Sequence, residues 1–157
     1  MRLIYSKPNL RDLSQGSRLA FIRQFKLMTQ DYVAGQLGTT GECKRRTMTR
    51  YEKGERNPKD DRTLFLSNLY GVSFNAIKRY DGKELIDIIY QLMWLEELIP
   101  GYDIRVSEVS KVNNKDIIYF KKFINEWDEM KIKRNKKEIS YEEYINWKFN
   151  YEIKEGI

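Results

Sequence analysis

Basic side chains gather in one short stretch of this chain, between residues 44 and 56. The stretch holds six of them: Lys44, Arg45, Arg46, Arg50, Lys53 and Arg56. Lysine and arginine donate charged hydrogen bonds to oxyanions, and the planar fork of arginine can also donate two bonds to one guanine edge. Such a cluster is typical of a protein that binds a polyanion. A solvated surface with no partner is the other interpretation.

The net positive charge of the chain comes from its first half. Of 157 residues, 29 are Lys or Arg and 23 are Asp or Glu, so the net charge is +6. Residues 1–82 hold 16 basic and 8 acidic residues, a net charge of +8. That leaves 13 basic and 15 acidic residues, a net charge of −2, for residues 83–157. We predict a boundary between two domains at Asp81-Gly82.

The residue types that most enzymes need are scarce. The chain has no histidine, which removes histidine acid–base catalysis, Ser-His-Asp triads and nearly all zinc sites. Adjacent helical residues point about 100° apart, so Glu96-Glu97 is predicted to be a solvated helix edge rather than a carboxylate pair. The single cysteine, Cys43, is predicted to be a plain thiol, with a redox sensor as the alternative. We expect no catalytic residues, no metal and no cofactor.

The same composition predicts where the chain resides. No apolar run approaches the roughly 18 residues of a membrane span, so we expect no membrane contact. A lone cysteine fits the reducing cytoplasm.

Two short helices joined by a glycine-marked turn must position the basic residues. The first is predicted to begin after the N-cap Thr29 and to end at Gly38. The second carries the basic cluster, ends at Gly54, and turns Met48 and Tyr51 inward. A turn followed by a basic second helix is the arrangement of a helix-turn-helix.

Residues 16–80 resemble the DNA-binding domain of lambda-repressor-like, or Xre-type, regulators. The residues that carry the resemblance fall in the family's order: Thr29-Gln30, Ala34, Leu37-Gly38, Tyr51-Glu52, Gly54, Pro58 and the segment from Leu69 to Ser73. The resemblance implies a five-helix domain that binds DNA sequence-specifically. Residues 1–15 are then an irregular N-terminal arm.

The resemblance also implies which residues contact DNA. The predicted base contacts are Arg45, Arg46, Thr47 and Arg50. The predicted phosphate contacts are Gln30, Lys44, Thr49, Lys53 and Arg56. The sequence departs from the family between Gly38 and Met48, where nine residues intervene and the family has fewer. We expect the insertion either to lengthen the turn or to extend the second helix by about one turn.

The other helices of the first half are predicted from caps and apolar spacing. The first helix should begin at Gly16-Ser17, with Ser17 as its cap. A fourth helix, residues 62–70, should be capped by Asp60 or Asp61, and Ser73 should cap a fifth. The side chains expected to face the core are Leu19, Ile22 and Phe25 in the first helix and Leu64, Leu66 and Leu69 in the fourth.

Residues 83–157 are predicted to form a smaller helical domain. Its first helix should bury Leu85, Ile88, Ile89, Leu92, Met93, Leu95 and Ile99. A short β-hairpin follows at residues 102–114, then a helix over residues 118–136 whose last part, 131–137, is a basic linker. Ser140 and Glu143 have capping-box spacing and begin the last helix. The tryptophans and tyrosines are interpreted as core, with a ligand pocket as the alternative.

The sequence therefore predicts a mainly all-α protein and a regulator of transcription. The segment from Glu138 to Tyr151 resembles the C-terminal region of small bacterial and phage helix-turn-helix proteins, which implies no chemistry. We expect a repressor that binds an inverted repeat of double-stranded DNA as a homodimer, with residues 83–157 as a dimerisation or partner-binding domain. The alternative is a protein-binding inhibitor of a phage or mobile element, similar to anti-CRISPR proteins, whose helix-turn-helix regulates its own promoter.

Overall fold

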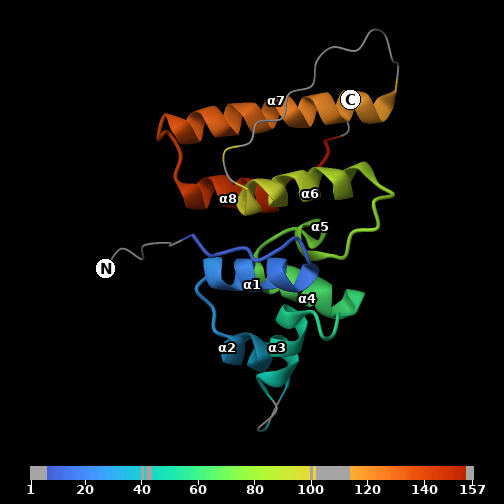
Figure 1. The fold of residues 1–157 in the computed structure, drawn as a ribbon, viewed down its shortest axis with the longest axis vertical. Helices are drawn as coiled ribbons and strands as arrows, with labels where there is room; N and C mark the ends of the chain where they lie inside the picture. The colour runs from blue at the N-terminus through green and yellow to red at the C-terminus, as the bar shows by residue number, and fades with distance from the viewer. Residues whose placement is uncertain (1–6, 40, 42–43, 100, 102–113, 155–157) are drawn as a thin grey trace. The chain divides into compact units, whose positions relative to one another are not determined.

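The computed structural model describes residues 7–39, 41, 44–99, 101 and 114–154, and this part of the chain is mainly helical (Figure 1). Eight helices and no strand lie within the described residues, which confirms the predicted all-α class. The chain divides into two compact units, residues 1–79 and residues 80–157. The predicted hairpin at residues 102–114 falls outside the described residues, apart from Asn114.

Unit 1 is built from five helices, α1 to α5 (Figure 1). Their bounds are α1 Gln15–Phe25, α2 Gln30–Gln36, α3 Arg46–Lys53, α4 Asp60–Tyr70 and α5 Phe74–Ile77. Helix α3 packs against α1 and α2, while α5 packs against α4 and α1. The core holds the expected Leu19, Ile22, Phe25, Met48 and Tyr51, together with Phe21, Val33, Ala34, Leu66, Tyr70, Ala76 and Ile77.

Local capping chemistry sets most of the helix ends in unit 1. Thr29 caps α2 and Ser73 caps α5, as predicted. The prediction that Ser17 caps α1 is wrong: Ser14 has an extended backbone and its hydroxyl accepts from the Ser17 amide, so α1 begins at Gln15. The predicted cap of α4 is also wrong. Lys59 is its N-cap without a side-chain bond, and Asp60 and Asp61 lie in the first turn, where carboxylates favour the helix dipole.

Helix α4 packs through a face different from the predicted one. It buries Thr63, Leu66, Ser67 and Tyr70, which recur every three or four residues. Leu64 falls off this face and its side chain is 51% exposed, so the prediction that it faces the core is wrong. Two of these buried side chains, Thr63 and Ser67, carry hydroxyl groups. The Ser67 hydroxyl donates to the Leu64 carbonyl at 2.7 Å, which satisfies it locally.

Unit 2 is built from three helices, α6 Leu85–Leu98, α7 Lys115–Asn135 and α8 Tyr141–Phe149 (Figure 1). Helix α7 packs against both α6 and α8. Aromatic rings dominate the core, and Trp94 stacks on Phe149 with centroids 4.4 Å apart. The other large buried side chains are Ile89, Tyr90, Met93, Phe123, Ile124, Trp127, Tyr144 and Ile145. For Trp94 and Trp127 the core interpretation is therefore correct.

Three details of unit 2 differ from the sequence-based predictions. Ile88 and Ile99 are exposed, whereas α6 buries Asp87 and Glu97. Asn114 caps α7 and so belongs to a helix start rather than a hairpin turn. Residues 131–135, predicted as a linker, are the last part of α7. The capping box of Ser140 and Glu143 at the start of α8 is confirmed.

Candidate nucleic-acid interface

Helix α3 has one buried and one basic face. Its buried side chains are Met48, Tyr51 and Glu52. Arg46, Arg50 and Lys53 are spaced by four and three residues, which places them on the opposite side at about 100° per residue. Arg46 and Lys53 are exposed, and Arg50 is half-buried. Predicted base contacts and a predicted phosphate contact therefore share one stripe of the helix.

A buried carboxylate connects α3 to the two other helices around it. Glu52 accepts hydrogen bonds from the Arg23 guanidinium of α1, through Nε and through Nη2, the latter at 3.1 Å. It also accepts from Gln30 Nε2 of α2 at 2.7 Å. The side chains of Arg23 and Glu52 are only 11% and 7% exposed. This Glu52 clamp, formed by Arg23, Glu52 and Gln30, fixes how α2 and α3 lie together.

Two residues from the N-terminal part of the chain contact the backbone of α3. Arg11 Nη2 donates to the Glu52 carbonyl at 2.6 Å. A Cβ atom added at Gly16 of α1 would lie 2.5 Å from the Tyr51 carbonyl oxygen, a distance that side chains do not tolerate. Only glycine at this position lets α1 approach the backbone of α3 so closely. These contacts fix the position of α3, and therefore of its basic face, within unit 1.

Gln30 also contacts two other residues that are predicted to bind DNA. Its Oε1 lies 3.2 Å from Arg45 Nε and 3.2 Å from the Thr49 hydroxyl, and both donate to it. The structure therefore brings Gln30, Arg45 and Thr49 into one cluster. Gln30 and Arg45 border an open hollow of about 470 Å³ that Arg23, Met28, Thr29 and Asp31 also line. The donors of Arg23 and the Gln30 amide are already directed at Glu52, so Arg45 is the cation at this hollow that is best placed to meet an oxyanion.

The residues that follow Gly38 do not extend α3 by a further turn. Gly38 has a left-handed φ of 77°, and the Thr39 amide donates back to the Ala34 carbonyl at 3.2 Å, so α2 ends in a Schellman motif. The Thr39 hydroxyl lies 2.6 Å from the Ala34 carbonyl and 3.1 Å from the Lys44 carbonyl. Helix α3 begins only at Arg46. Cys43 lies outside the described residues.

The remaining predicted residues lie around this core of the site. The end of the Lys44 side chain passes over Gly35 of α2, 3.2 Å from where a Cβ would stand. Thr47 is half-buried. Arg56 is exposed just beyond α3, where the left-handed Gly54 ends the helix. Nothing in the described contacts brings Arg56 to the Gln30 cluster.

Sequence reasoning missed the residues that hold the site together. Glu52 belongs to the Tyr-Glu-x-Gly signature, yet no role was predicted for its carboxylate. Arg23 lies 29 residues earlier in α1. The available signal is the charge pattern: Glu52 is an acid within a basic helix, four residues after the buried Met48 and next to the buried Tyr51. Such an acid needs a buried cation, because an unpaired buried charge is costly.

Unit 2 contains a second buried polar network, and it overturns the prediction for Glu96-Glu97. Lys148 of α8 is fully buried, and its Nζ lies 3.1 Å from Glu96 Oε1 and 2.8 Å from Glu97 Oε1. Tyr144 donates to Glu96, and Tyr141 donates to Glu97 at 3.0 Å. Burial and the adjacent carboxylates raise the pKa of both tyrosines. The two carboxylates diverge on α6, but one long lysine from another helix reaches both.

Comparison of the chain with protein families, with curated proteins and with solved structures gives no match. None of the helices in the described part of the chain combines the length and the apolar character that crossing a bilayer requires. Within the same residues, no cluster of acidic, histidine or cysteine side chains is suited to a metal ion.

Proposed function

We propose that this chain is a sequence-specific DNA-binding regulator of transcription, acting as a repressor. The observation that carries the proposal is the basic stripe of α3, on the side opposite to the buried Met48 and Glu52. A short helix with a rigidly held inner face and an arginine-bearing outer face is suited to the major groove, which admits one α-helix.

In the proposed mechanism, α3 enters the major groove and its arginines recognise base edges. Arg46 and Arg50 donate to guanine O6 and N7, and each such pair contributes about 1–3 kcal/mol of discrimination against other bases. Arg45 is oriented by Gln30 Oε1, which restricts the directions in which its fork can donate. Orientation before binding lowers the entropy lost in the complex.

Phosphate contacts set the register in this mechanism. Lys44, Lys53 and Arg56 are solvent-accessible around α3, and we propose Gln30 and Thr49, which lie together, as further phosphate contacts. The net charge of +8 on residues 1–82 supports association with a polyanion. We further propose that a homodimer binds an inverted repeat and that unit 2 provides the self-association, because lambda-repressor-like proteins recognise paired half-sites.

The proposal is tested by comparing three alanine variants on a selected operator and on random DNA. Arg46→Ala and Arg50→Ala should weaken operator binding about 10–100-fold and random-DNA binding by less than about fivefold. Arg79→Ala, which removes the same charge outside α2 and α3, is the matched control and should weaken both equally. Equal losses on the two DNAs for Arg46→Ala would show that the stripe contacts only phosphates and reads no sequence.

A further inference from the structure

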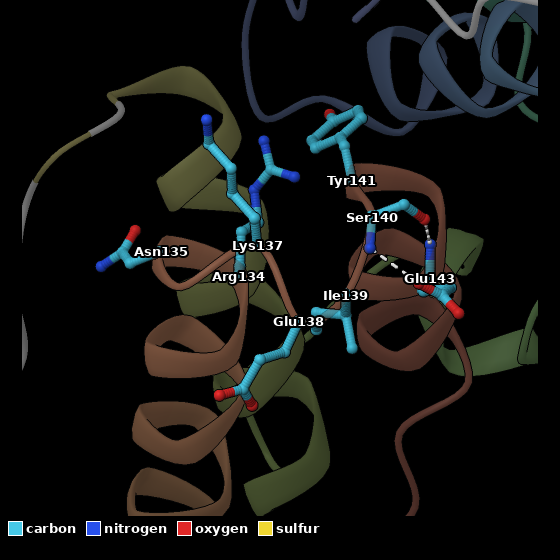
Figure 2. Close-up of a pocket in the computed structure, with 8 residues that line it drawn as sticks. All are labelled: Arg134, Asn135, Lys137, Glu138, Ile139, Ser140, Tyr141 and Glu143. Atoms are coloured by element: carbon cyan, nitrogen blue, oxygen red, sulfur yellow. Dashed lines mark hydrogen bonds between the residues drawn. The ribbon is translucent and has the colours of Figure 1, made fainter.

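Unit 2 contains an open hollow of about 640 Å³ where α7 turns into α8 (Figure 2). It is lined by Arg134, Lys137, Glu138, Ile139 and Tyr141, among others. The volume falls within the range of roughly 300–1,000 Å³ that small-molecule sites occupy. Nothing in the proposed DNA-binding mechanism uses this part of the chain.

The charges around the hollow are separated. In Figure 2, Arg134 and Lys137 point to the same end as Tyr141, whereas Glu138 points to the opposite end. Five of the seven residues from 131 to 137 are lysine or arginine, although residues 83–157 as a whole carry a net charge of −2. A ligand with one anionic group at the Arg134 end would be attracted there and would keep that group away from Glu138.

Arg134 is held in place without an ion pair. Its guanidinium lies 4.7 Å from the centre of the Tyr141 ring and 5.9 Å from that of Tyr144. Among the described residues, no carboxylate forms an ion pair with Arg134. The two tyrosines are themselves fixed, because their hydroxyls donate to Glu97 and Glu96. The buried network thus orients an arginine whose guanidinium donors no other described residue occupies.

Lys137 is fixed by the backbone. It has a left-handed φ of 60°, and its amide donates to the Arg134 carbonyl at 3.0 Å. This ends α7 with the Lys137 side chain beside the hollow (Figure 2). At the start of α8, the capping box already occupies the amides of Ser140 and Glu143. Attraction for an anion therefore comes from side chains of α7 and from Lys137.

We propose that the hollow between α7 and α8 binds a small organic anion, whose carboxylate or phosphate group receives the Arg134 fork and the Lys137 ammonium. Arginine donates to both oxyanions in a bidentate manner. Tyr141 and Ile139 supply apolar surface for the rest of the ligand. A small molecule is favoured over a nucleic acid because the site is concave and because an extended polyanion would meet Glu138.

The test is a two-dimensional NMR titration of the full chain at constant ionic strength, with inorganic phosphate in one arm and acetate in the other. The reporters are the Arg134 Nε–H signal and the Trp127 indole N–H, which donates to Tyr144 at 2.9 Å. We expect saturable shifts of both signals in at least one arm. Arg134→Gln should weaken the binding about tenfold or more. The stronger arm identifies the preferred group.

Two further variants keep the test decisive. Lys137→Gln changes an exposed side chain, so it should fold normally and weaken binding about threefold or more. Lys122→Gln, which removes one exposed charge from α7 away from the hollow, is the control and should bind like the wild type. Linear, unsaturable shifts, or wild-type binding by both Arg134→Gln and Lys137→Gln, would overturn the proposal. So would a random DNA duplex that shifts the same signals when neither anion does. Failure to bind DNA leaves this experiment unaffected, so the two proposals fail separately.

Discussion

Replacing Glu52 with alanine tests the clamp that presents the basic face of α3. The change removes the carboxylate that Arg23 and Gln30 share, and it leaves Arg23 with the Met28 carbonyl as a described acceptor, at 2.8 Å. Because the Arg23 side chain is only 11% exposed, water can replace the lost partner only in part. We expect a large loss of stability in unit 1.

The size of the loss follows from the burial of the pair. Removing one partner of a buried ion pair costs about 3–5 kcal/mol, and the retained Met28 bond favours the lower end, about 3 kcal/mol. In a domain of this size, 1 kcal/mol lowers the melting temperature by about 4–8 °C. Glu52→Ala should therefore lower the melting temperature of unit 1 by about 12–24 °C. Glu52→Gln keeps the shape and one acceptor oxygen, so it should cost about 1–2 kcal/mol.

Far-UV circular dichroism of the full chain measures this loss, and tryptophan fluorescence separates the two units. All three tryptophans, Trp94, Trp127 and Trp147, belong to unit 2, so their fluorescence does not report the unfolding of unit 1 directly. Glu55→Ala is the control, because Glu55 is exposed and its loss should cost below about 0.5 kcal/mol. If Glu52→Ala and Glu55→Ala melt at the same temperature, the clamp does not stabilise unit 1 and the reasoning fails.

Three further predictions concern packing and pH. Gly16→Ala should destabilise unit 1 by about 1–3 kcal/mol, because its Cβ would meet the Tyr51 carbonyl; an unchanged urea midpoint by circular dichroism would show that α1 can move away without cost. Lys148→Met should lower the stability of unit 2 by about 3 kcal/mol, since it leaves the buried Glu97 and the partly buried Glu96 without their cation; a tryptophan-fluorescence midpoint equal to that of the wild type would contradict this. Burial and Glu96 raise the pKa of Tyr144 above its ordinary 10.0, so the stability it contributes is present below that pH and is lost as the pH rises above it. The urea midpoint of unit 2 should therefore fall between about pH 9 and about pH 11, and less so in Tyr144→Phe; an equal fall in both proteins would refute this role of Tyr144.

The parts of the fold that local chemistry determines could be predicted from the sequence. Thr29, Ser73 and Ser140 each cap the helix that was expected, because a cap hydroxyl bonds to an amide only two or three residues away. Met48 and Tyr51 are the two large uncharged side chains of α3. They lie three residues apart, so both fall on one side of the helix and face the core. Gly54 ends that helix for a similarly local reason, its left-handed φ of 77°.

Features that depend on a distant partner could not be predicted in the same way. Leu64 and Ile88 are apolar residues on helices with apolar side chains on more than one side, and only the neighbouring helix decides which face is buried. The sequence around Glu96 and Glu97 does not reveal their partner, because Lys148 lies about fifty residues further along the chain. Local periodicity contains no information on such a pairing.

The same distinction applies to the candidate interface. The sequence identified the basic residues, and the structure arranges Arg46 and Arg50 on one face of α3. The sequence does not reveal that the Gln30 amide nitrogen donates to Glu52 or that its carbonyl oxygen accepts from Arg45. The expectation that Gln30 binds phosphate stays a prediction, and in this arrangement Gln30 also positions another contact.

Selection from a random DNA library with the full-length protein tests the central claim most directly. The wild-type chain should enrich one inverted repeat, and a variant with Arg46→Ala and Arg50→Ala should lose that enrichment while keeping weak, salt-sensitive binding to any DNA. Absence of an enriched sequence with the wild type, or the same repeat enriched by the variant, would contradict the account of α3 as a recognition helix.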